Sequence, residues 1–98
     1  MTIAVLGAGM VGRAIALDLA ADFDVTSFDV NAQNLALLQQ RNPQIKTQLA
    51  DLRNTAAYEA MLSDFDMVVT AVPGFMGFET LKAVINAGKN VAIKHLSV

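Results

Sequence analysis

Gly7-Ala8-Gly9-Met10-Val11-Gly12 decides the fold of this 98-residue chain, because it joins a predicted strand directly to a predicted helix. Thr2–Leu6 is an apolar run typical of a buried strand, and the stretch from Met10 to Ala21 carries apolar residues at helical spacing. Asp29, which follows Gly7 by 22 residues, ends the next predicted strand. A G-x-G-x-x-G between a strand and a helix, with an acidic residue about 20 positions later, is the pattern of a dinucleotide-binding βαβ unit. The alternative, a tight strand–helix turn without a ligand, does not need all of these elements together.

The three glycines of this motif have different predicted roles. Gly7 permits the tight turn, Gly9 lets a pyrophosphate approach the backbone, and Gly12 lets the helix pack close to the strand. The free N–H groups and the positive dipole end of the helix then suit an anion. We therefore expect a dinucleotide to bind with its phosphates at this helix start.

The predicted cofactor is NAD rather than NADP. Asp29 is placed to accept hydrogen bonds from the adenosine ribose hydroxyls, although a helix-capping or merely solvated carboxylate is the alternative. Val30 and Asn31 supply no cation for a 2′-phosphate, which the Asp29 carboxylate would also repel. Arg13 is interpreted as a solvated helix residue, with phosphate contact as the alternative.

The composition excludes several classes of function. The net charge of −2 provides no basic surface for nucleic acid. The absence of cysteine and the single histidine exclude a disulfide framework, a thiol nucleophile and a thiolate or histidine metal cluster. No apolar run reaches the roughly 18 residues of a membrane span, and the apolar N-terminus lacks the basic leader of a secretory signal. The default expectation is a cytoplasmic, single-domain protein over residues 1–98.

The rest of the chain continues the alternation of strands and helices. This order predicts an α/β fold, a Rossmann-type parallel sheet of five strands in the order 3-2-1-4-5 with helices on both faces. The nucleotide would lie across the carboxyl ends of strands one and four. Later strands are expected at 24–29, 45–49, 67–72 and 90–93. Helices are expected from an Asn31 cap to before Pro43, from an Asn54 or Thr55 cap through Leu62, and at about 77–87 with Gly88 following.

Three segments carry a likeness to a known family: Ile3–Gly12, Ala50–Asn54, and Asp66–Gly74 together with Ala87–Val91. In these segments the chain resembles the N-terminal nucleotide-binding domain of the saccharopine dehydrogenase-like oxidoreductases, which include lysine 6-dehydrogenase-like enzymes and saccharopine reductases. The last segment is the most distinctive, because a strand ending in Val-Pro-Gly and a helix closing on Ala-Gly-Lys-Asn-Val are typical of that family. The resemblance covers essentially the whole chain and implies a cofactor domain of an oxidoreductase acting on an amino acid or amine.

The resemblance also implies further contacts with the cofactor. Asp51, followed by Leu52, would lie near the adenine, with a simple turn role for Asp51 as the alternative. The turn Ala71-Val72-Pro73 would approach the nicotinamide half. The full set of candidate cofactor-binding residues is Gly7, Ala8, Gly9, Met10, Val11, Gly12, Asp29, Val30, Asp51, Leu52, Ala71, Val72 and Pro73.

The chain departs from the family after the last predicted strand. Family members continue into a substrate-binding and catalytic domain, whereas this sequence stops at Val98 and its tail Lys94–Val98 does not match. No catalytic or metal-binding residue is therefore predicted, and we expect a fragment or truncated product that is not active alone. The rival function is a non-enzymatic, ligand-sensing regulatory domain of the kind that gates potassium transport, which also opens with G-x-G-x-x-G and an acidic residue after strand two.

Self-association is the final expectation from the sequence. The strand at 90–93 would be a short apolar edge, and such an edge can pair with another chain. Phe75, Met76 and Phe78 form an apolar cluster, which suits a contact surface, although ordinary packing of the following helix is the alternative. We therefore expect a homodimer through the fifth strand or the Phe75 region.

Overall fold

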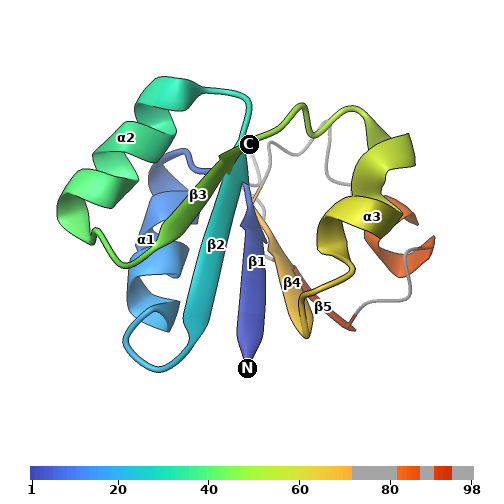
Figure 1. The fold of residues 1–98 in the computed structure, drawn as a ribbon, viewed down its shortest axis with the longest axis horizontal. Helices are drawn as coiled ribbons and strands as arrows, with labels where there is room; N and C mark the ends of the chain where they lie inside the picture. The colour runs from blue at the N-terminus through green and yellow to red at the C-terminus, as the bar shows by residue number, and fades with distance from the viewer. Residues whose placement is uncertain (72–81, 87–89, 94–98) are drawn as a thin grey trace.

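A parallel five-stranded sheet in the order β3-β2-β1-β4-β5 forms the centre of the computed structural model, which describes residues 1–71, 82–86 and 90–93. Helices cover both faces, with α1 and α2 on one side and α3 on the other (Figure 1). The strands are β1 (Thr2–Leu6), β2 (Asp24–Asp29), β3 (Lys46–Leu49), β4 (Met67–Thr70) and β5 (Asn90–Ile93). The other elements are α1 (Met10–Leu19), α2 (Ala32–Arg41), the 3-10 turn η1 (Thr55–Ala57), α3 (Tyr58–Leu62) and a helical stretch at 82–86. The predicted fold class and strand order are confirmed.

β1 is central because its side chains are buried on both faces of the sheet. Ile3 and Val5 belong to one apolar cluster, and Ala4 and Leu6 belong to another. Such two-sided burial explains why this strand is a continuous apolar run rather than an alternating one. The cluster on the side of α1 and α2 also contains Ala16, Val25, Leu38, Ile45 and Val69. The cluster on the side of α3 also contains Phe28, Leu52, Tyr58, Leu62, Val68 and Val84.

Some element bounds differ from the prediction. α1 ends at Leu19 instead of Ala21, because the N–H groups of Ala21 and Asp22 bond three residues back, to Asp18 and Leu19, in a tightened last turn. β3 starts after Ile45, whose N–H closes a turn onto the carbonyl of Asn42. β4 ends at Thr70, so Ala71 lies just beyond it. The predicted helix at 77–87 is seen at 82–86, and its remaining positions and Gly88 lie outside the described residues.

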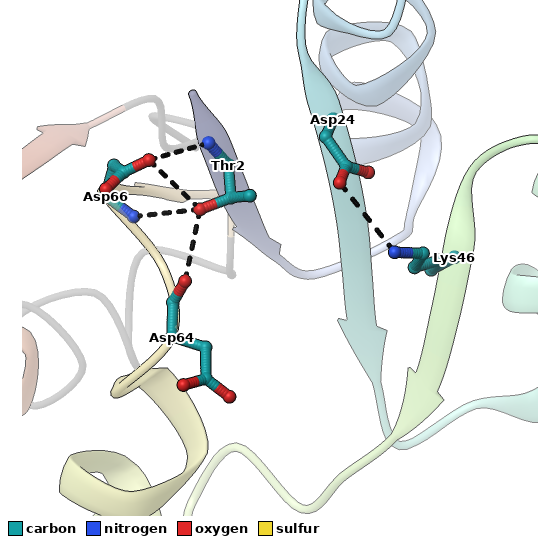
Figure 2. A network of polar contacts seen from close by, with 5 residues as sticks. All are labelled: Thr2, Asp24, Lys46, Asp64 and Asp66. Atoms are coloured by element: carbon teal, nitrogen blue, oxygen red, sulfur yellow. Dashed lines mark hydrogen bonds and ion pairs between the residues drawn. The ribbon is translucent and has the colours of Figure 1, made fainter.

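The amino ends of β1 and β4 are held together by Thr2 and Asp66 (Figure 2). The Thr2 N–H donates to Asp66 Oδ2 at 2.9 Å, and the Asp66 N–H donates to the Thr2 carbonyl at 2.9 Å. Thr2 Oγ1 also lies 3.1 Å from Asp66 Oδ2 and 3.1 Å from the carbonyl oxygen of Asp64. The exposed pair Asp24–Lys46, at 3.7 Å on the other side of β1, contributes little by comparison. The Thr2–Asp66 bonds thus help to fix which strand becomes the second neighbour of β1.

Ser27 is the buried polar side chain whose hydroxyl has no hydrogen-bond partner among the described residues. It lies in β2, fully buried, opposite Val5 of β1. An unsatisfied buried hydroxyl costs roughly 1–3 kcal/mol of desolvation. Strand alternation places Ser27 on the same face of the sheet as Val25, which belongs to the cluster on the side of α1 and α2.

Ser27→Ala should therefore raise the free energy of unfolding by about 1 kcal/mol, because it removes the unpaired hydroxyl at almost constant volume. Urea denaturation measures the change, with Ser63→Ala as the control. Ser63 is exposed, and its replacement should change stability by less than about 0.5 kcal/mol. A loss of stability in Ser27→Ala would mean that the hydroxyl has a bound partner such as a buried water.

Candidate functional site

The glycine-rich turn follows β1 at the carboxyl edge of the sheet, beside the ends of β2 and β4. Gly7 has a φ of 103°, a left-handed conformation that side chains rarely adopt, so a glycine is required at the first position. Its N–H donates to the carbonyl of Phe28 at 2.8 Å, which fastens the start of the turn to β2. The predicted turn role of Gly7 is therefore borne out by its backbone.

Gly12 and Gly9 differ in what surrounds them. A β-carbon on Gly12 would lie 2.0 Å from the carbonyl oxygen of Gly7, so α1 can pack this close to the turn only with glycine there. A β-carbon on Gly9 would meet nothing within 4 Å. Gly9 has a φ of −67°, which suits any residue. No contact with a described residue therefore explains the glycine at position 9.

The N-terminus of α1 is open, whereas that of α2 is capped. The N–H groups of Gly9, Met10, Val11 and Gly12 donate to no residue in the described part of the chain, and no side chain caps this helix. In α2, by contrast, Asn31 Oδ1 accepts from the N–H groups of Gln33 at 2.9 Å and Asn34 at 3.2 Å. α1 also has no acidic residue in its first turn to offset the positive end of its dipole. An anion could use all of these donors.

Asp29 holds the glycine-rich turn from the end of β2. Its Oδ2 accepts from the Ala8 N–H at 2.7 Å, and its Oδ1 accepts from the Asn31 N–H at 2.9 Å. The side chain is only partly buried, and each carboxylate oxygen can accept more than one hydrogen bond. Asp29 therefore lies at the end of β2, as predicted, and also braces the turn, a second role that sequence reasoning missed.

Arg13 is not the simply solvated residue that the sequence suggested. It is partly buried, and its Nη1 donates to the carbonyl oxygen of Ala8 at 2.9 Å and to Asn34 Oδ1 in α2 at 3.2 Å. The guanidinium therefore joins the glycine-rich turn to the second helix. Its position directly after the third glycine was the available signal, because the first turn of the helix brings that side chain back beside the turn.

The candidate residues around this turn differ in exposure. Met10 is 81% exposed and Val30 is 64% exposed, so both apolar side chains are open to contact at the carboxyl edge. Val11 is partly buried, and Ala8 is fully buried. Met10 opens α1, and Val30 directly follows Asp29, so each exposed apolar side chain is next to a part of the candidate site.

Asp51 and Leu52 follow β3 and point to different environments. Asp51 is exposed, and a hydrogen bond from the Arg53 side chain lowers the pKa of its carboxyl group, aided by the Arg53 backbone N–H. Leu52 is buried in the α3-side cluster, and its carbonyl accepts from the Tyr58 hydroxyl at 2.7 Å. Of this pair, the Asp51 side chain is the one open to a ligand.

Beyond β4, Ala71 is partly buried, and its N–H donates to the carbonyl of Leu6 at 2.8 Å. This bond places Ala71 beside the start of the glycine-rich turn. The predicted contacts Val72 and Pro73 lie outside the described residues, as do Phe75, Met76 and Phe78. Among residues 1–71, 82–86 and 90–93 there is no group of three His, Cys, Asp or Glu side chains able to hold a metal, and no helix long and apolar enough to cross a membrane.

Comparison with protein families gives a match over nearly the whole chain. The family model described as the saccharopine dehydrogenase NADP binding domain matches residues 3–93. No curated protein sequence matches the chain.

Solved structures contain the same arrangement as one part of longer chains. The apo saccharopine dehydrogenase (L-Glu forming) of Saccharomyces cerevisiae is 25% identical with a TM-score of 0.79, over 98% of this chain and 22% of the yeast chain. A short-chain dehydrogenase/reductase of Veillonella parvula in complex with NADP is 15% identical with a TM-score of 0.68, over 94% of this chain and 46% of its own. The Bordetella bronchiseptica enzyme WbmG in complex with NAD is 14% identical with a TM-score of 0.72, over 95% of this chain and 36% of its own. The last two likenesses concern the fold alone, and this chain spans less than half of each of the three proteins.

Proposed function

This chain belongs to the family of saccharopine dehydrogenase NADP-binding domains, and we propose that it binds NAD(H) for an oxidoreductase that acts on an amino acid or an amine. Dinucleotide binding follows from the family. The choice of NAD and the class of substrate are our proposals. The observation that carries the proposal is the open space at Gly9, because a pyrophosphate needs backbone that it can approach closely.

The phosphates would lie on the uncapped start of α1. The unpartnered N–H groups of residues 9–12 supply donors there, and the absence of an acidic residue in that turn leaves the positive end of the helix dipole uncompensated. The turn is already held by Asp29 and by the Phe28 carbonyl, so binding would require little ordering of the backbone. When bound, the nicotinamide carries the hydride, and the protein supplies position and electrostatics.

The adenosine half would lie between the ends of β2 and β3. The Asp29 carboxylate retains acceptor capacity for the ribose hydroxyls, and the exposed Val30 offers an apolar surface for the adenine. Asp51, an exposed carboxylate that also accepts from Arg53, would accept from a donor on the adenine edge. On the other side of the turn, Ala71 with Val72 and Pro73 would approach the nicotinamide half.

Gly9→Val should abolish dinucleotide binding while the chain stays folded, because the new side chain occupies open space in the free protein and the phosphate region in the complex. The expected loss of affinity is at least about a hundredfold, or roughly 2.7 kcal/mol. Isothermal titration calorimetry measures it, with thermal unfolding as the check of folding.

Gly12→Ala is the matched control for this substitution. Its β-carbon would collide with the Gly7 carbonyl, so this variant should lose stability in the absence of ligand. Retained affinity in a folded Gly9→Val protein would show that the phosphates lie elsewhere.

The wild-type protein should bind NAD(H) more tightly than NADP(H), because the Asp29 carboxylate accepts from a free 2′-hydroxyl and repels a 2′-phosphate. Asp29→Ala should lower the ratio of the NAD(H) affinity to the NADP(H) affinity by about tenfold or more. Calorimetric titration of each protein with both dinucleotides measures the ratio of affinities. Tighter binding of NADP(H) to the wild type would contradict the assignment and agree with the description of the family.

We further propose a homodimer through β5. This strand forms one edge of the sheet, and no described strand pairs with its outer side. Sedimentation velocity at micromolar concentration should show a dimer, since a two-fold pairing of identical edges is the commonest closed solution. A clean monomer over that concentration range would exclude it.

A further inference from the structure

A closed ring of hydrogen bonds lies beside the glycine-rich turn. Asp29 Oδ2 accepts from the Ala8 N–H, and the Ala8 carbonyl accepts from Arg13. Arg13 also donates to the Asn34 side chain, the Asn34 N–H donates to Asn31 Oδ1, and the Asn31 N–H donates back to Asp29 Oδ1. The ring therefore joins the glycine-rich turn, the start of α1, the cap of α2 and the end of β2.

Arg13 carries the only positive charge in this ring, and no carboxylate neutralises it directly. Both of its contacts are with neutral oxygens, the Ala8 carbonyl and the Asn34 amide, and both come from Nη1. No ion pair involves Arg13 among the described residues, whereas Lys46 and Arg53 each pair with an aspartate. A guanidinium has five N–H donors, so Nε and Nη2 remain available without breaking either contact.

Arg13 and Asp29 act on opposite ends of the same residue. The carboxylate binds the Ala8 N–H, and the guanidinium binds the Ala8 carbonyl. The two charged groups are therefore held within a few ångströms of one backbone unit, with Arg13 leaning towards α2 rather than towards the phosphate-facing N–H groups of α1. A ribose bound by Asp29 would therefore be near both charged groups.

We propose that Arg13, supported by Asn34, is a specificity-determining residue that opposes Asp29 and binds the 2′-phosphate whenever NADP(H) occupies the site. This proposal rests on the proposed function, because it assumes that Asp29 marks the ribose. A guanidinium presents a planar pair of donors that fits phosphate oxygens, and Asn34 limits its freedom, so little side-chain entropy is lost on binding. The preference of the domain for NAD(H) is then a balance between a repelling carboxylate and an attracting guanidinium.

The test is a double-mutant cycle of Asp29→Ala and Arg13→Gln, each protein titrated with NADH and NADPH. Asp29→Ala should shift the affinity ratio towards NADPH, and adding Arg13→Gln should reverse that shift by about tenfold, because the phosphate loses its charge-assisted partner. The affinity for NADH in the double variant measures any loosening of the turn, which should weaken both dinucleotides alike, so the effect of Arg13 on the phosphate is taken from the ratio of the NADPH and NADH affinities. The Arg13-dependent part of NADPH binding should also weaken as salt is raised, because it arises from charge.

Two controls separate recognition of phosphate from bracing of the turn. Arg13→Lys keeps the positive charge but loses the planar guanidinium donors, so it should retain part of the NADPH affinity. Arg41→Gln, at the exposed end of α2, should leave the ratio of the NADPH and NADH affinities unchanged. Thermal unfolding of each variant confirms that it is folded. A second comparison uses 2′,5′-ADP and 5′-ADP, which differ in the 2′-phosphate and both lack the nicotinamide. The difference between their affinities therefore measures recognition of the 2′-phosphate alone.

Equal losses for NADH and NADPH in the Arg13→Gln proteins would overturn the proposal, because they would make Arg13 only a brace of the turn. An unchanged ratio in the double variant relative to Asp29→Ala would overturn it as well. A wild-type protein that binds neither dinucleotide would instead contradict the proposed function, and this inference with it.

Discussion

The contact between Gly12 and Gly7 is the constraint on which the rest of the site depends. With no side chain at position 12, α1 starts against the Gly7 carbonyl, so close that a β-carbon would be only 2.0 Å from that oxygen. The first turn of α1 is thereby held beside the end of β1, and its unpaired N–H groups lie at the carboxyl edge. A larger residue would displace the helix, and with it the donors of the phosphate site.

The fold could be predicted almost completely from the sequence, because each signal that it uses is local. Buried parallel strands are continuous apolar runs, and the glycine spacing of the first turn specifies a strand–helix unit. Asn31 as the cap of α2 was predicted for the same reason, since its role depends only on the next three residues. The bounds were less certain because the last turn of a helix and the first residue of an edge strand depend on a single hydrogen bond each.

The site was harder to predict where its contacts cross between elements. The environment of Arg13 depends on how α2 lies beside α1, which no local pattern specifies, so a solvated side chain was the natural interpretation. Asp29 was placed correctly at the end of β2, but its bond to Ala8 requires the three-dimensional approach of two segments. For Leu52, the sequence neighbour of an exposed aspartate, burial against Tyr58 follows from the packing of α3 and not from the turn itself.

Asp29 has two roles, the proposed ribose binding and bracing of the turn, and this limits how substitutions can change the preference between NAD(H) and NADP(H). The same carboxylate that would bind the ribose hydroxyls holds the Ala8 and Asn31 N–H groups, one on each oxygen. An amide in its place could accept through one oxygen only and would turn a donor towards the other N–H group. Loss of the carboxylate therefore relieves repulsion of a 2′-phosphate and loosens the turn at the same time. Arg13, which holds the opposite end of Ala8, is the contact that would preserve the turn through such a change.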